Sequence, residues 1–452
     1  MSSSPRTPSR RPVALLAFAA IALTALFVPG RAGAASSASI NASGPYSGEA
    51  DAAQLALTVV DLTAEGGPLD VITANLLKAL GLGGGNIAAL TLDPTRASVD
   101  SDGPINGDPS QRAYGFASNL DPNQKTLLDS INLTPLLTTV QRTAPRDTPP
   151  TVTDNLLAVP LPPLLNADVA RGTATANFGA DGECPSSTSP ISLGRVDVAT
   201  AQVLSTGPGL PDLLNVGNGV AYIQSTTSLP VTSGTGRAVA TQSQVNLGQV
   251  NLLNTLGGTD GLRIGVEPAT LTATATGLPN GAGFVYTQPN LVNLNDNSVI
   301  TVSQINTLIN GALGPVFGLL EPLVDVQFNF TPSQSGLGSA DGTSVSKDIT
   351  VATLTVTLVE ALGGLNLLTL DLVPLHADAQ APLGGINCVD NPVKIDKTAT
   401  KTEVKPGESF DYNITFTNTA TDCTLTNTSL TDVITGPSGS TITGTNPTAT
   451  SV

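Results

Sequence analysis

The stretch that decides the fold is Val351-Ala352-Thr353-Leu354-Thr355-Val356-Thr357-Leu358. In an extended chain, Leu354, Val356 and Leu358 share one face and three threonines share the other. Successive side chains of a strand point to opposite sides, so this strict alternation predicts a β-strand with one buried and one exposed face. The same period recurs at residues 174–178, 239–247 and 271–275.

Turn signals rich in glycine separate the alternating segments, at residues 233–236, 257–261 and 278–283. Turns of this kind favour hairpins over crossover helices, and half-buried strands joined by hairpins form antiparallel sheets. Aromatic residues make up only 3% of the chain, so Val, Leu, Ile and Ala must fill the core. We therefore predict a mainly β protein containing one or more β-sandwich regions.

A few short helices accompany these strands in the prediction. The strongest candidate starts near Ser303, where apolar residues follow at three- and four-residue spacing as far as Leu313. Residues 70–80 and 125–133 are two shorter candidates, which end at a glycine and before a proline. We expect these helices to cover sheet edges or to link sheets.

The N-terminus has the pattern of a secretory signal peptide. Arg10 and Arg11 precede an uncharged apolar run at residues 13–28, and small residues follow it. We expect cleavage between Ala34 and Ala35, which would leave a secreted chain. The run is short for a membrane-spanning helix, and proline or acidic residues interrupt the later leucine-rich patches. We therefore expect no transmembrane segment in the mature chain.

Composition points to an extracellular protein and away from nucleic acid. The chain carries 35 acidic and 19 basic residues, a formal net charge of −16, so a polyphosphate backbone is not an expected partner. It has one Met and no Trp, which is typical of exported proteins that resist oxidation. With 40% hydrophobic residues, it is long enough and apolar enough to form packed domains.

The C-terminal segment contains Gly384-Gly385-Ile386-Asn387-Cys388, a Pro406-Gly407 turn, an alternating strand from Phe410 to Thr417, and Cys423-Thr424-Leu425-Thr426-Asn427. In these features it resembles the bacterial immunoglobulin-like repeat catalogued as domain of unknown function eleven. That family occurs in tandem on secreted and wall-associated proteins, especially of actinobacteria. The resemblance implies an immunoglobulin-like β-sandwich that serves as a stalk or adhesion module.

Three regions follow from these observations. Residues 1–34 form the signal peptide, residues 35–386 a large β-rich extracellular region with one or two subdomains, and residues 387–452 the surface repeat. A sandwich domain of this class needs about 100 residues, so we expect the repeat to be incomplete here.

The three cysteines predict one disulfide bond in an exported chain. Because Cys388 and Cys423 both fall in the segment that resembles the repeat, the resemblance suggests that they pair. The alternative bond, between Cys184 and Cys388, would tie the large region to the junction and stays open. The cysteines lack the close spacing of zinc ligands.

No catalytic residue and no resident cofactor are predicted. His376 is the only histidine, and no Gly-x-Ser-x-Gly nucleophile motif accompanies it. One metal candidate exists, because four side chains with hard oxygen ligands lie close together and resemble a calcium loop, although their spacing also suits a solvated turn. These residues are Asp100, Asp102, Asn106 and Asp108.

Taken together, the sequence predicts a secreted or cell-surface structural or adhesive protein that is not an enzyme and that has an extracellular or cell-envelope partner. One alternative is an extracellular hydrolase of the glycosidase type, which would use paired carboxylates. Another is a binding module stabilised by calcium. Two acids that converge in a cleft would favour the first alternative, and an ion at Asp100 and Asp102 would favour the second.

Overall fold

The computed structural model describes residues 38–42, 44–59, 90–124, 128, 133–145, 147–161, 165–178, 184–198, 201–205, 212–216, 221–254, 262–266, 268–293, 298–307, 324–358, 366–390, 393–399 and 412–418. All of them belong to the compact unit Ser37–Val452. The predicted signal peptide with Ala34 and Ala35, the helix predicted at residues 70–80, and Cys423 lie outside the described residues. Of the helix predicted at residues 125–133, only Leu128, which is helical, and Leu133 are described.

The mainly β prediction is confirmed. The largest sheet, called sheet I below, has the order β25-β27-β28-β2-β5-β6-β7, and β3 and β4 extend it next to β28. All its neighbouring strands are antiparallel. Its strands are β2 (Ser47–Ala52), β3 (Leu55–Val59), β4 (Leu90–Leu92), β5 (Thr95–Asp100), β6 (Ala113–Ser118), β7 (Thr139–Ala144), β25 (Val324–Phe330), β27 (Ser344–Leu358) and β28 (Asn366–Gln380).

The middle of the chain forms sheet II, with the order β26-β22-β21-β18-β15-β12-β11-β8. The alternation predicted at residues 239–247 is confirmed in β18, where every second residue is buried. The strands of sheet II are β8 (Thr151–Leu156), β11 (Ala170–Ala176), β12 (Ser192–Val198), β15 (Ala221–Ser228), β18 (Val239–Asn246), β21 (Ala269–Ala275), β22 (Ala282–Thr287) and β26 (Gln334–Leu337).

A third sheet continues sheet II along the chain. Except for β24, each of its strands directly precedes or follows a strand of sheet II, as β19 follows β18 after Leu247. The order of this sheet is β24-β23-β20-β19-β14-β13-β10-β9. Its strands are β9 (Val159–Leu161), β10 (Leu165–Ala167), β13 (Ala201–Ser205), β14 (Asp212–Val216), β19 (Gly248–Asn254), β20 (Leu262–Val266), β23 (Leu291–Asn293) and β24 (Ser298–Val299).

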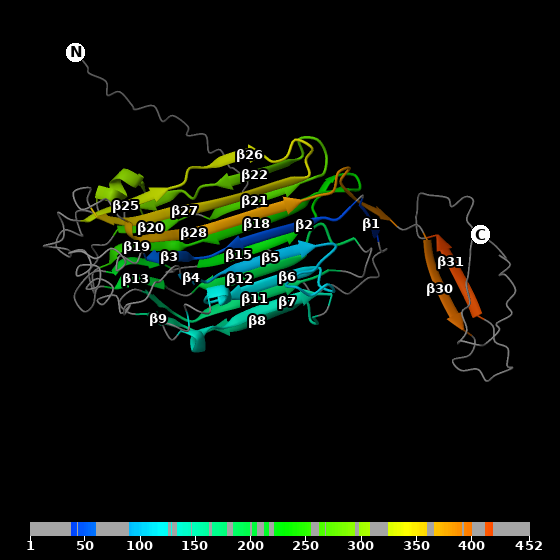
Figure 1. Cartoon of the computed structure of the whole chain (residues 1–452), viewed down its shortest axis with the longest axis horizontal. Helices are drawn as coiled ribbons and strands as arrows, with labels where there is room; N and C mark the ends of the chain where they lie inside the picture. Colours follow the sequence, from blue (N-terminus) through cyan, green and yellow to red (C-terminus); the bar gives the residue numbers. More distant parts are fainter. Residues whose placement is uncertain are drawn as a thin grey trace, which may run out of the picture. The chain divides into compact units, whose positions relative to one another are not determined.

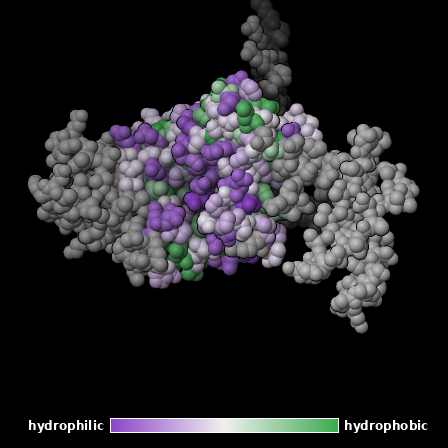
Figure 2. Space-filling model, turned by 45° about the vertical axis from the view of Figure 1, so that its right-hand side comes forward, coloured by the Kyte–Doolittle hydropathy of each residue, from purple (hydrophilic) through white to green (hydrophobic). Residues whose placement is uncertain are grey.

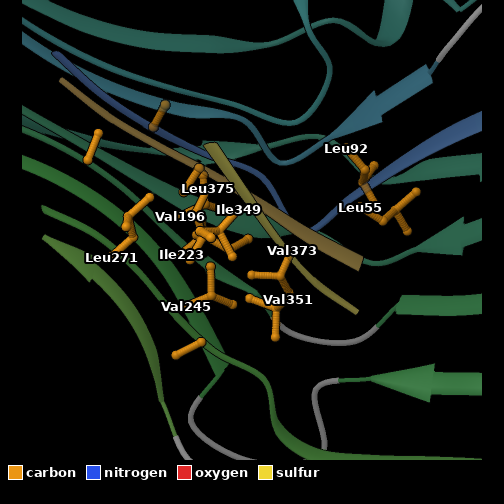
Figure 3. Packing of buried hydrophobic residues seen from close by; sticks show 14 of the residues in the cluster. Leu55, Leu92, Val196, Ile223, Val245, Leu271, Ile349, Val351, Val373 and Leu375 are labelled. Atoms are coloured by element: carbon orange, nitrogen blue, oxygen red, sulfur yellow. The ribbon is translucent and has the colours of Figure 1, made fainter. Parts of the chain in front are cut away.

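Sheets I and II pack face to face as a β-sandwich. β5 contacts β12 and β15, β2 contacts β18, and β28 contacts β18 and β21, so their strands overlap in Figure 1. Apolar side chains from both sheets meet between the layers (Figure 3). The labelled members of this core are Leu55, Leu92, Val196, Ile223, Val245, Leu271, Ile349, Val351, Val373 and Leu375.

The two sheets approach closely because small residues face each other across the core. A Cβ atom added to Gly194 on β12 would collide with the carbonyl oxygen of Phe116 on β6, and one added to Gly115 would collide with the carbonyl oxygen of Leu193. Buried hydroxyls then link the layers, since the Ser243 side chain donates to the carbonyl of Asp51 at 2.8 Å. The scarcity of aromatic residues thus suits a thin, close-packed sandwich.

Three irregular backbone positions lie side by side in sheet I, and we call them the bulge line. It consists of Gln54 between β2 and β3, Asp93 between β4 and β5, and Val373 within β28. The backbone N–H of Gln54 donates to Leu92, and that of Val373 donates to Gln54, both at 3.0 Å. Asp93 has φ 51° and Val373 has φ 60°, so both lie in the left-handed region. Val373 is the rarer case, because β-branched residues seldom adopt this conformation.

The chain enters and leaves this region through one small sheet of order β1-β29-β17-β16, here called the junction sheet. β1 (Ala38–Ala42) pairs antiparallel with β29 (Ile386–Asp390), so Ala38 lies opposite Asp390. β29 also pairs with β17 (Gly236–Arg237), which pairs with β16 (Val231–Ser233). The boundary predicted between residues 386 and 387 therefore falls inside a strand, and residues 387–390 pair with strands of the large region.

The structure corrects the favoured cysteine pairing. Cys388 on β29 is bonded to Cys184, in the segment before β12, and the Cα atoms are 5.8 Å apart. Cys388 is therefore not available to Cys423, and the alternative bond between Cys184 and Cys388 is the one present. The physical reason is that β29 is hydrogen-bonded to β1 and β17, which places Cys388 with the large region instead of with the repeat.

Two smaller predictions also have an outcome. β30 (Val393–Ala399) and β31 (Tyr412–Asn418) form an antiparallel hairpin, so the alternating strand predicted at residues 410–417 exists and begins two residues later. Residues 302–307 are helical, so the helix predicted near Ser303 exists, but Ser303 lies inside it and does not cap it. The cap is Thr301, whose side-chain oxygen accepts the backbone N–H of Gln304 at 3.3 Å. No helix in the described ranges is long and apolar enough to cross a membrane.

Candidate functional site: a polar groove on sheet I

A row of polar residues crosses the outer face of sheet I. Asp348 on β27 lies opposite His376 on β28, His376 lies opposite Asp51 on β2, and Asp51 lies opposite Arg96 on β5. Arg96 in turn lies opposite Phe116 on β6. Residues directly opposite each other in a sheet point to the same side, so these five side chains share one face. Their neighbours Ala50, Ala97 and Ala377 are buried in the core, which places the row on the outside.

Close polar contacts connect neighbouring members of the row. The Nε atom of Arg96 lies 2.8 Å from Oδ1 of Asp51 and 3.1 Å from Oε1 of Glu49. Nδ1 of His376 lies 2.8 Å from Oδ1 of Asp348. The Arg96 side chain is 39% exposed, and partly exposed pairs of this kind contribute little to stability. Their consequence is therefore geometric, because they orient donors and acceptors in alternation along the sheet.

Burial changes the acidity of several groups around the row. Burial, together with the nearby Asp51 carboxylate, raises the pKa of Glu49 above its ordinary value, although Arg96 lowers it. Burial likewise raises the pKa of Asp378, two residues along β28 from His376. Burial raises the pKa of the Tyr114 hydroxyl to about 12, so Tyr114 stays a neutral donor at physiological pH.

A groove with a volume of about 440 Å³ lies over this row. Asp51, Arg96 and His376 line one part of it, and residues next to the bulge line, such as Pro94 and Pro374, line another. Two surface segments form the rim, one carrying Asn106 and the other carrying Asp121 to Asn123 at the start of the short 3₁₀ helix η1 (Pro122–Gln124). The volume lies in the range of pockets that hold small-molecule ligands.

The loop that contains the calcium candidates forms part of this rim. Oδ1 of Asp100 accepts the backbone N–H groups of Asp102 and Gly103, each at 3.0 Å. Oδ1 of Asp108 accepts the backbone N–H of Ser110 at 2.9 Å and its hydroxyl at 2.7 Å. Within the described part of the chain, no group of three or more His, Cys, Asp or Glu side chains could hold a metal ion. Asp100 and Asp108 each accept hydrogen bonds within their own turn.

The same loop covers the aromatic end of the row. Ile105 packs on Tyr114 and Phe116 in a small buried cluster, and the two rings are stacked with centroids 6.0 Å apart. Asn106 follows Ile105 and lines the groove, so one candidate calcium ligand belongs instead to the rim. Asn106 has φ 52°, a conformation that asparagine tolerates better than most residues.

Several carboxylates lie in or beside the groove, and Asp51, Asp121 and Asp348 line it. Glu49 and Asp51 converge, but they do so on one Arg96 nitrogen, which offsets their charge. Of the two, Asp51 lines the groove and Glu49 does not. A ligand in the groove therefore meets a mixed row of hydrogen-bond donors and acceptors.

Sequence reasoning missed the row, apart from His376. A signal was present in β2, where Glu49 and Asp51 alternate with Gly48, Ala50 and Ala52. That pattern indicates a strand with one charged face, but the partners of the face depend on strand pairing. Comparison with protein-family models, with curated proteins and with solved structures finds no match. The relation of residues 387–452 to the immunoglobulin-like repeat therefore remains a prediction.

Proposed function

We propose that this chain is a secreted or cell-surface structural and adhesive protein, whose sandwich binds an extracellular or cell-envelope partner without catalysis. The observation that carries the proposal is the junction. Strands β1 and β29 pair antiparallel where the chain enters and leaves, and the bond between Cys184 and Cys388 closes the region next to them. A module connected at one place suits display from a stalk.

The disulfide bond also determines how the module would respond to force. A pull on the segment after Asp390 would separate β29 from β1, one pair of hydrogen bonds at a time, because Ala38 lies opposite Asp390. Beyond Cys388 the force would pass through the covalent bond to Cys184. The strands from β12 to β28 lie between these cysteines, so intact covalent closure protects them from being extended.

Two further features support an extracellular role. Disulfide bonds persist mainly in oxidising compartments, which agrees with the predicted signal peptide. In Figure 2, hydrophilic residues gather across the described part of the face in view, and hydrophobic residues form small separate patches. A surface of this kind suits a hydrated partner better than a large apolar one.

Fractionation of the producing cells tests the proposal. We expect the chain in the medium or the envelope fraction, sensitive to protease added to intact cells, with residues 184 and 388 disulfide-bonded. A known cytoplasmic protein serves as the control and should stay uncleaved when protease is added to the intact cells. A chain found entirely inside the cells, with reduced cysteines, would contradict the proposal.

A further inference from the structure

We infer that the groove on sheet I binds a neutral saccharide through Asp348, His376, Asp51 and Arg96 of the row and the two prolines that line the same groove, Pro94 and Pro374. The inference deepens the proposed function and rests on it only for the source of the saccharide, a glycan at a cell or tissue surface. The binding itself is a property of the folded chain.

The first argument is the alternation of donors and acceptors. Asp348 and Asp51 offer acceptors, Arg96 offers donors, and His376 lies between the two carboxylates. A carboxylate has about four lone-pair sites and a guanidinium has five N–H donors, so each group keeps capacity after its ion pair has formed. A hydroxyl group both donates and accepts, and it can therefore bond to each of these four polar side chains.

Charge argues against the other simple ligands. A divalent cation would meet Arg96 between the acids, and an anion would meet Asp51, Asp121 and Asp348. Because Arg96 is paired with Asp51, a neutral polyhydroxylated ligand enters without leaving either charge unpaired. This is the class of ligand that the groove accommodates with the smallest electrostatic penalty.

The rest of the groove matches the two-sided character of a sugar ring, which has polar edges and apolar faces. Asn106 and Asn123 on the rim carry amides that both donate and accept. Pro94 and Pro374 present apolar surface in the same groove. A saccharide can therefore place its hydroxyl groups on the row and the rim while an apolar face rests on the prolines.

Backbone strain provides an independent reason to regard the groove as a built site. Val373 has φ 60°, and the next residue, Pro374, lines the groove. Asp93 has φ 51°, and the next residue, Pro94, also lines it. Strained residues persist where the surrounding structure over-determines them, and they concentrate at binding sites. Here two of them directly precede groove residues, one in β28 and one between β4 and β5, on either side of the connection between β2 and β3.

Binding of defined tetrasaccharides to the purified chain tests the inference. The probes are immobilised β-1,4-linked glucose, β-1,4-linked N-acetylglucosamine, α-1,4-linked glucose, α-1,6-linked mannose and β-1,4-linked galactose, which separate wall-type from tissue-type and storage-type glycans. Calcium chloride and inorganic phosphate are tested alone as competing ligand classes. We expect saturable binding to at least one tetrasaccharide without added calcium.

Matched variants locate the binding. Asp51→Asn and Asn123→Ala should each raise the dissociation constant at least tenfold. Asn123 is an exposed residue of the rim, so its truncation does not threaten the fold. Asp197→Asn is the control, because Asp197 forms a similar pair with Arg195 at 2.6 Å on the outer face of sheet II, outside the groove. It should leave binding unchanged. Thermal unfolding of each variant confirms that the chain is folded.

Failure of the inference is distinguishable from failure of the proposed function. Absence of binding to all five tetrasaccharides would overturn the inference, and so would binding of calcium or phosphate alone. Equal weakening by Asp197→Asn would also overturn it, because general surface charge would then be the cause. None of these results concerns the location of the chain, which the fractionation experiment measures separately.

Discussion

Replacement of Asp93 by asparagine should change how stability depends on pH. Asp93 lies on the bulge line and is 3% exposed, and burial raises the pKa of its carboxyl from 3.8 to about 8. Its ordinary pKa holds in the unfolded chain. Between about pH 4 and pH 8 the folded chain therefore binds one proton more than the unfolded chain at this site.

The sign and the size follow from linkage. A raised carboxyl pKa contributes stability that is present below the unfolded pKa and is lost as the pH rises toward the folded pKa. The loss is about 1.4 kcal/mol per pH unit, so about 4 kcal/mol disappears between pH 4 and pH 7. Asparagine cannot ionise, keeps nearly the same shape, and tolerates the positive φ of 51° at this position.

Urea unfolding at pH 4, 5, 6, 7 and 8 measures the effect. Asp93→Asn should match the unchanged chain near pH 4 and exceed it by several kcal/mol at pH 7. A smaller slope should remain, because burial also raises the pKa values of Glu49 and Asp378. Asp341→Asn is the control, since hydrogen bonds from Ser339 and Thr343 lower the pKa of this exposed carboxyl, and the slope above pH 5 should not change. The reasoning is refuted if Asp93→Asn keeps the full slope.

Three further predictions concern the covalent closure and the layer contact. Cys184→Ser opens the covalent loop between residues 184 and 388, which are 204 positions apart, so it should lower the free energy of unfolding by about 5 kcal/mol. When the unfolded chain is pulled from both ends in a single-molecule experiment, this variant should extend about 70 nm further than the unchanged chain. An equal extension would show that the bond is absent. Gly194→Ala places a methyl group against the carbonyl oxygen of Phe116, so it should lower the free energy of unfolding in urea by more than about 3 kcal/mol. The control is Gly234→Ala, because Gly234 has no neighbour within 4 Å and a φ of 55°, and it should lower the free energy of unfolding by about 1 kcal/mol. Ser243→Ala removes a donor to two carbonyl groups of sheet I and should cost about 1–3 kcal/mol, and a cost near zero would show that the layers do not depend on this bond.

The strands were predictable from sequence because their pattern is local. In β18 the alternation names the buried residues one by one, including Thr241 and Ser243, which are polar yet lie in the core. The period of two requires only that the chain be extended and that one face be buried. The same period predicted the strand β31, and apolar residues at three- and four-residue spacing predicted the helix near Ser303.

Pairing was not predictable, because it depends on residues far apart in the sequence. Cys388 belongs to the segment that resembles a repeat, but ladder bonds to β1 and β17 place it with Cys184. The candidate calcium ligands lie close together in the sequence, and this closeness suggested that they bind one common ion. In the folded loop Asp100 and Asp108 instead accept hydrogen bonds from their own turns.

The groove shows why a site on a sheet face is hidden from sequence reasoning. Its row joins Asp51 and Arg96, near the start of the chain, to Asp348 and His376, and the join is the ladder between β2 and β28. A shift of one residue in that ladder would turn Asp51 into the core and leave His376 without its neighbour. Each charged residue alone reads as a solvated surface position. The site therefore exists only because β2 and β28, which come from the two ends of the large region, pair in the middle of sheet I.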